Sequence, residues 1–202
     1  MKKILVTVLI GLCVLCGTTS AMAVVLPPSN VFSEGLLAPI STDPILELLD
    51  VPFVGTDAAG KVWFLGTLTQ RVYREEAGLL FTYEFTNDED SLDPIQSLST
   101  QDFSGFTTDV DVEESEDTFL KRSLSGSTVT FFAPGDGVLQ GDTTPLLWIQ
   151  TNAKSYKWGS TQLQDGGNAR IQTYAPATPE PSTMALLGMG ILGLFGLGRR
   201  KA

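Results

Sequence analysis

The sequence predicts an all-β protein, an antiparallel β-sandwich. Three observations indicate this fold: short runs of β-branched and aromatic residues recur along the middle of the chain, Gly, Pro and Asp turns separate them, and no long amphipathic helix interrupts them. About seven or eight strands in this arrangement are typical of a sandwich, and a barrel is the alternative. We expect the sandwich over residues 61–174, flanked by a signal peptide and a C-terminal transmembrane sorting helix.

The chain begins with an export signal over residues 1–23. Two lysines precede an apolar run from Ile4 to Cys16, and Ala21 and Ala23 fit the small-x-small pattern at which signal peptides are cleaved. We therefore expect the mature chain to begin at Val24, with a retained signal anchor as the alternative.

Both cysteines of the chain, Cys13 and Cys16, lie inside this apolar run. Their C-x-x-C spacing resembles a redox or metal motif, but removal of the signal peptide removes both of them. The bulky Leu15 before Cys16 also disfavours a lipid attachment site. The mature protein is thus expected to have no thiol and to be held by its core, which about 155 residues can supply.

Residues 24–60 form a Pro-containing N-terminal segment with weak patterning. One short helical piece is predicted from Pro44 to Leu49, because proline is tolerated in the first turn after a capping residue such as Thr42 or Asp43. The rest of the segment is expected to be extended chain or an edge strand.

The β character begins after residue 60. Val62 to Leu68 and Thr69 to Arg74 are rich in aromatic and β-branched residues, and Glu75 to Gly78 is predicted as a turn. Leu79 to Thr86 alternates between large apolar residues and mostly polar ones, a period of two that indicates a strand with one buried face. The two sides of the turn should form a hairpin.

Further strands are predicted between turns rich in Gly, Pro and Asp. The polar loop 87–91, the turn 134–137 and the turn 165–168 separate them. The expected strands are Ile95–Leu98, a bent strand over Phe103–Val112, Thr128–Ala133, Leu146–Thr151 and Ile171–Tyr174.

The charge excludes some function classes. The whole chain carries a net charge of −10, and residues 24–178 hold eight Lys and Arg against twenty-two Asp and Glu, a net charge of −14. Nucleic-acid binding needs a basic surface, so no nucleic-acid partner is expected. The chain has no histidine, which removes the commonest general base and the commonest transition-metal ligand.

An acidic run from Asp109 to Asp117 is the one candidate cation site. Asp109, Asp111 and Glu113 offer oxygen ligands for Ca²⁺, but their alternation with valines fits a strand with one solvated face better. Paired carboxylates for glycoside hydrolysis are not singled out by any spacing. We therefore expect no catalytic residue, no metal and no cofactor, and we expect that the protein is not an enzyme.

Exposed aromatic residues are the other candidate contacts. Trp63, Trp148, Tyr156 and Trp158 could stack on sugar rings, since such rings pack on flat apolar faces that carry a polar handle. Tyr156 and Trp158 are the preferred pair because they lie in a polar, loop-like stretch. Packing in the core or at its rim is the alternative for all four.

The end of the chain has the layout of a sorting signal. A linker at residues 175–182 leads into an apolar, Gly-rich segment at 183–198, and a basic tail follows at 199–202. The apolar run from Met184 is roughly 22 Å long as a helix, short for a membrane, and the basic end should stay cytoplasmic. The residues of this signal are Pro179, Glu180, Pro181 and Ser182 in the linker and Arg199, Arg200 and Lys201 at the basic end.

This tail resembles the PEP-CTERM sorting signal of Gram-negative bacteria, which an exosortase processes. The resemblance implies export, transient anchoring in the inner membrane, cleavage near Pro179–Pro181, and release to the cell surface or extracellular matrix, often in biofilms rich in exopolysaccharide. It implies two partners, the exosortase and exopolysaccharide.

The middle of the chain also resembles a recurrent ectodomain of such proteins, for which no activity is implied. Four segments carry that resemblance: Gly66–Thr69, the strand from Phe81 to Asn87, Phe103–Phe106 and Gln150–Ala153. The expected function is that of a non-catalytic surface or matrix protein, with a carbohydrate-binding module or a glycoside hydrolase as the alternatives.

Overall fold

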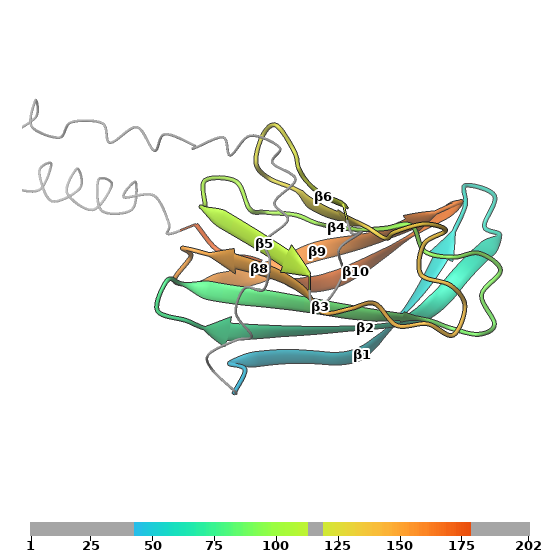
Figure 1. Cartoon of the computed structure of the whole chain (residues 1–202), viewed down its shortest axis with the longest axis horizontal. Coiled ribbons are helices and arrows are strands. Elements are labelled where there is room, and N and C mark those ends of the chain that lie inside the picture. The colour runs from blue at the N-terminus through green and yellow to red at the C-terminus, as the bar shows by residue number, and fades with distance from the viewer. Residues whose placement is uncertain (1–42, 113–118, 179–202) are drawn as a thin grey trace, which may run out of the picture.

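A computed structural model describes residues 43–112 and 119–178. The predicted signal peptide with its cleavage site at Ala21 and Ala23, the segment 24–42 and the tail from Pro179 to Ala202 lie outside the described residues. Every regular element of the described part is a β-strand (Figure 1). The strands are β1 Leu46–Thr56, β2 Val62–Arg74, β3 Leu79–Asn87, β4 Ser97–Thr100, β5 Thr108–Val112, β6 Phe119–Arg122, β7 Val129–Phe132, β8 Leu147–Thr151, β9 Tyr156–Asp165 and β10 Gly167–Pro176.

The prediction of an all-β, antiparallel fold is confirmed, but the strands form one sheet and not the two of a sandwich. The order is β5-β8-β3-β2-β1-β10-β9-β4-β7-β6, and every pairing is antiparallel. The pairing of Thr56 with Asn168 joins β1 to β10. We call β5-β8-β3-β2-β1 the first half-sheet and the remaining five strands the second half-sheet; the sheet folds at this junction, so the halves form two layers (Figure 1).

The core lies between the two half-sheets, and the pattern of β3 explains it. The predicted inward residues Leu79, Phe81, Tyr83 and Phe85 are confirmed, since all are buried in the main apolar cluster. The prediction of a single buried face is wrong for the first half of β3, because Leu80 and Thr82 on the other face are buried as well. The second half-sheet contributes buried side chains from β4, β7, β9 and β10 to the same cluster. These side chains include Leu98, Val129, Phe131, Leu163, Ala169 and Ile171.

Buried polar side chains also bridge the two layers. The hydroxyl of Tyr83 on β3 lies 3.1 Å from the hydroxyl of Thr100 on β4, and both side chains are fully buried. Burial raises the pKa of Tyr83 well above its ordinary value, so the phenol stays protonated. The buried Gln70 on β2 lies opposite Tyr83, and its side-chain amide donates a hydrogen bond to the backbone carbonyl of Tyr174 on β10. These bonds tie the two half-sheets together at defined positions.

The hairpin of β2 and β3 is confirmed, with its turn at the predicted residues. Glu75 and Gly78 exchange backbone hydrogen bonds across the turn, and the two predicted runs before it form the single strand β2. Gly78 lies directly against the backbone of Thr151 and Ala153, where no side chain would fit. The same turn therefore also fixes the end of β8.

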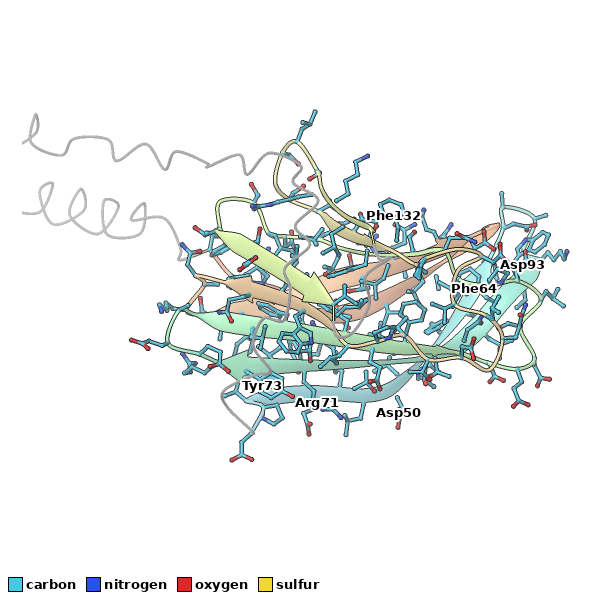
Figure 2. All side chains as sticks on the ribbon, viewed as in Figure 1. Asp50, Phe64, Arg71, Tyr73, Asp93 and Phe132 are labelled. Atoms are coloured by element: carbon cyan, nitrogen blue, oxygen red, sulfur yellow. The ribbon has the colours of Figure 1, made fainter. Side chains whose placement is uncertain are left out.

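The helical piece predicted from Pro44 to Leu49 is wrong, because these residues enter β1. The backbone N–H of Ile45 donates to the carbonyl of Val72, and the pairing with β2 starts at Leu46. Prolines are tolerated here because the edge of β1 that faces β10 is paired only at Thr56. A bulge follows, in which Asp50 has a φ of 49°. Figure 2 shows Asp50 and Arg71 on the β1 side of the molecule and Phe132 on the opposite side.

The other predicted strands differ mainly at their ends. The strand predicted from Ile95 begins at Ser97, and β5 covers only the last part of the bent strand that was predicted from Phe103. The strands β7 and β8 lie within the predicted runs, while β10 extends the predicted strand in both directions. The strand β6 was not predicted.

No helix long and apolar enough to cross a membrane occurs among residues 43–112 and 119–178. The predicted sorting helix at 183–198 lies outside this part of the chain.

Candidate functional site

The site with the most distinctive chemistry lies on the hairpin of β9 and β10. The two strands pair over their full length, from Asp165 with Gly167 next to the turn to Tyr156 with Pro176 at the open end. The turn falls on the predicted Gly-containing segment. However, the prediction that Tyr156 and Trp158 lie in a loop is wrong, because both are on β9.

Side chains on this hairpin alternate between the core and solvent. Thr161 and Leu163 of β9 and Ile171 and Thr173 of β10 are buried, so the residues between them point outward. The outward side chains form one continuous face, because each outward residue of β9 lies directly opposite an outward residue of β10.

Three aromatic rings at the open end of the hairpin form what we call the aromatic platform: Tyr156, Trp158 and Tyr174. Trp158 and Tyr174 are directly paired and stacked, with ring centroids 4.4 Å apart and an angle of 23° between the planes. Tyr156 meets Tyr174 edge-on at 5.7 Å. Trp158 is 53% exposed and Tyr156 42%, so their faces are open to solvent. Flat apolar surfaces with a polar handle suit sugar rings.

The backbone beneath the platform is fixed from two sides. The Gln70 amide donates from Nε2 to the Tyr174 carbonyl at 2.8 Å and accepts from the Tyr174 N–H at 2.7 Å, as a neighbouring strand would. On β9, Lys157 lies between the two platform residues and its Nζ is 3.3 Å from Asp102 Oδ2. The platform is therefore part of a rigid strand pair and needs little ordering to bind.

A row of polar side chains continues from the platform toward the hairpin turn, and we call it the polar stripe. All its members are hydrogen-bonding side chains on outward positions, and Arg170 Nη2 donates to Ser160 Oγ at 3.2 Å. Its members are Ser160, Gln162 and Gln164 on β9 and Asn168, Arg170 and Gln172 on β10. Amides and hydroxyls both donate and accept, which matches the hydroxyl groups of a polysaccharide.

The two other tryptophans do not join this site. The Trp63 Nε1 donates to Asp57 Oδ2 at 3.1 Å, and Lys61 Nζ lies 3.4 Å from the centre of the Trp63 ring. The Asp57 pKa is lowered, chiefly because the Lys61 N–H donates to this carboxylate. Trp148 is 8% exposed and packs with other buried side chains. Both residues take part in local contacts of the fold, and neither lies on the hairpin of β9 and β10.

The acidic candidates lie elsewhere. Asp109 is exposed on β5, and the pairing of β5 with β8 places the backbone of Asp111 opposite Trp148. Glu113 and the acids after it lie outside the described residues. Within the described ranges, no group of three or more Asp, Glu, Cys or His side chains is placed to hold a metal ion.

Tyr174 and Gln70 are the site residues that the sequence did not single out. Tyr174 could have been found by counting from the turn, since Trp158 and Tyr174 are equally distant from Gly166. Gln70 gave no such signal. Its partner lies 104 residues away along the chain, and only the folded layers bring the two together.

Comparison with known families identifies the end of the chain. Residues 177–201 match the family model described as the PEP-CTERM protein-sorting motif. The chain thus carries this motif, which implies an exported protein processed at the membrane by an exosortase. The match begins one residue after the end of β10. Neither the curated proteins nor the solved structures contain a match to this chain.

Proposed function

We propose that this exported protein is a non-catalytic component of the cell surface or extracellular matrix that binds exopolysaccharide through the aromatic platform and the polar stripe. The observation that carries the proposal is the exposed Trp158, stacked on the half-buried Tyr174 at one end of a row of amides and hydroxyls. An apolar ring face and a row of hydrogen-bonding groups are the two features that sugar polymers require.

The same arrangement gives no support to hydrolysis. A glycoside hydrolase needs two carboxyl groups on opposite sides of the scissile bond. Asp102 is paired with Lys157, which lies between Tyr156 and Trp158, and the outward positions of β9 and β10 hold no acid. Binding is therefore the simpler interpretation, and release of sugars from the bound polymer would favour the enzyme.

The position of the sorting motif fits release of an intact folded domain. The last strand ends at Pro176, and Ala177 still donates its N–H to the Ser155 carbonyl. Pro179, Glu180 and Pro181 follow directly. We propose that the chain is anchored briefly in the inner membrane, with Arg199 to Lys201 on the cytoplasmic side, and is then cleaved near this motif.

Binding is tested with Trp158→Ala in the full-length chain, by affinity electrophoresis through gels that contain the host's exopolysaccharide. We expect roughly 2- to 10-fold weaker retention, equivalent to about 0.5–1.5 kcal/mol for one stacking contact. Leu49→Ala is the matched control, because Leu49 is also 53% exposed but lies on β1. Equal retention of both variants and the parent chain would refute the binding function.

Sorting is tested by the mass of the protein recovered from culture medium. A chain that begins at Val24 and ends near Pro181 supports the proposal. Glu180→Ala should leave uncleaved chain in the membrane. Full-length protein that stays in the membrane of a host with an active exosortase would contradict release.

A further inference from the structure

Carboxylates are unevenly distributed over the outward faces of the two half-sheets. Its outward positions hold no carboxylate on β4, β7, β9 or β10, in a chain whose residues 24–178 have a net charge of −14. Beyond the polar stripe, these positions include Ser99 on β4 and Thr130 on β7, whose hydroxyls are 2.8 Å apart. The acid-free area therefore spans four neighbouring strands.

The outward side of the first half-sheet differs in this respect. It carries Glu47 on β1, Glu84 on β3 and Asp109 on β5, each on a strand position that points away from the core. Glu47 is paired with Arg71 at 3.0 Å, so a polyanion that approaches this layer meets the carboxylates of Glu84 and Asp109. On the second half-sheet it meets amides, hydroxyls and Arg170.

Arg170 is the charged group of the polar stripe. It is exposed, and among residues 43–112 and 119–178 it forms no ion pair, only the hydrogen bond to Ser160. It lies four positions before Tyr174 on the same strand, which places it about 13 Å from the platform at about 3.3 Å per residue. One sugar ring cannot span this distance, so the platform and Arg170 contact different rings of one polymer.

We propose that the ligand is an anionic polysaccharide that contains uronic acids and lies along β9 and β10. One ring stacks on the aromatic platform, the hydroxyls of the following rings bond to the polar stripe, and a carboxylate pairs with the guanidinium of Arg170. This inference rests on the proposed function and names its ligand class. It also explains how an acidic protein binds an acidic polymer, because the polymer lies on a face whose outward strand positions hold no carboxylate.

A lipid surface is the competing occupant, because Trp and Tyr also favour membrane interfaces and the platform lies close to the start of the tail. The polar stripe favours the polysaccharide. A row of amides and hydroxyls that runs away from the platform supplies hydrogen bonds in series, which a polymer of hydroxylated rings uses and a lipid surface does not.

The test uses the full-length chain in neutral detergent with polygalacturonate and with the same polymer after reduction of its carboxyl groups. We expect tighter binding of the acidic form, with an advantage that falls as salt is raised. Arg170→Gln should reduce that advantage by about 2- to 5-fold, as for an exposed ion pair. Arg74→Gln is the control, since it removes the same charge from β2 of the first half-sheet and should leave the advantage unchanged.

The outcomes separate the inference from the proposed function. Equal binding of both polymers, lost in Trp158→Ala, would overturn the anionic ligand and keep polysaccharide binding. Binding of neither polymer would overturn both. A blue shift of Trp158 emission in vesicles of phosphatidylcholine and phosphatidylglycerol, measured against Trp158→Phe and absent with polymer, would assign the face to lipid instead.

Discussion

Gln70 shows how a single side chain can take the place of a strand. Along most of its length β10 has no hydrogen-bonded partner strand on the side of β1, because β1 pairs with it only at Thr56. The Gln70 amide satisfies both the N–H and the carbonyl of Tyr174, and its own side chain is fully buried. The strands β1 and β10 can therefore remain unpaired beyond Thr56 while the backbone groups of Tyr174, under the platform, still have hydrogen-bond partners.

Replacement of Gln70 by Leu should destabilise the protein. The apolar side chain keeps much of the volume but leaves the two backbone groups of Tyr174 without partners, at a cost of about 2–4 kcal/mol in the free energy of unfolding. Urea unfolding measures it. Gln172→Leu, on the exposed face of β10, should change stability by less than about 0.5 kcal/mol. Similar values for the two variants would contradict this role.

Asp57 makes the stability of the turn between β1 and β2 depend on pH. Its Oδ1 accepts from the N–H groups of Ala59 and Lys61, and its pKa lies below the ordinary value of 3.8. The contribution of the ionised group is therefore present above pH 3.8 and is lost as the pH falls through the lowered pKa.

Asp57→Asn should accordingly destabilise the protein at pH 7, and the difference should shrink as the pH falls below 3.8 and through the lowered pKa, where the carboxyl of the parent chain becomes neutral as well. Urea unfolding of both proteins across this range measures the difference. If the difference in free energy of unfolding between the two proteins stayed the same at every pH, the destabilisation would not come from loss of the Asp57 charge. An NMR titration should give an Asp57 pKa below 3.8.

At the scale of elements, the strands that the sequence predicted well are those with a clear alternation of residue types. β3 shows a clear period of two, because its inward residues fill the core and its turn contains Gly78. The first part of β1 was predicted as helix and the rest only as extended chain or an edge strand, because Pro44, Pro52 and the bulge at Asp50 hide the period. β9 was missed because its outward half is polar and aromatic, so that only Thr161 and Leu163 mark the buried side.

The turn between β2 and β3 gives a test at this scale. In Gly78→Ala the new methyl group meets the carbonyls of Thr151 and Ala153, which belong to the backbone and cannot rotate away. We expect a loss of about 1–3 kcal/mol in the free energy of unfolding. Gly135→Ala is the control, since nothing lies within 4 Å of the added atom and only its φ of 57° opposes the change. A smaller loss in Gly78→Ala than in the control would show that the turn moves away from β8.

At the scale of the molecule, the sequence allowed the all-β class and the sorting tail to be predicted, but not how the layers are joined. Turn residues and alternation are local signals, whereas the pairing of Thr56 with Asn168 joins residues far apart in the chain. The candidate site was predicted in part for the same reason. Tyr156 and Trp158 were chosen for their chemistry, and their partner Tyr174 depends on the register of the hairpin.

A continuous sheet with one shared core should unfold as one unit. Phe81 on β3 and Leu163 on β9 are fully buried in the same cluster, one in each half-sheet. Phe81→Ala should cost about 3–5 kcal/mol and Leu163→Ala about 2–5 kcal/mol, and both should lower the midpoint of the same transition. Tryptophan fluorescence and far-UV circular dichroism should give coincident urea curves for each variant. If each variant shifted a separate transition, the half-sheets would be independent folding units, and the bonds from Gln70 and Tyr83 across the layers would not couple them.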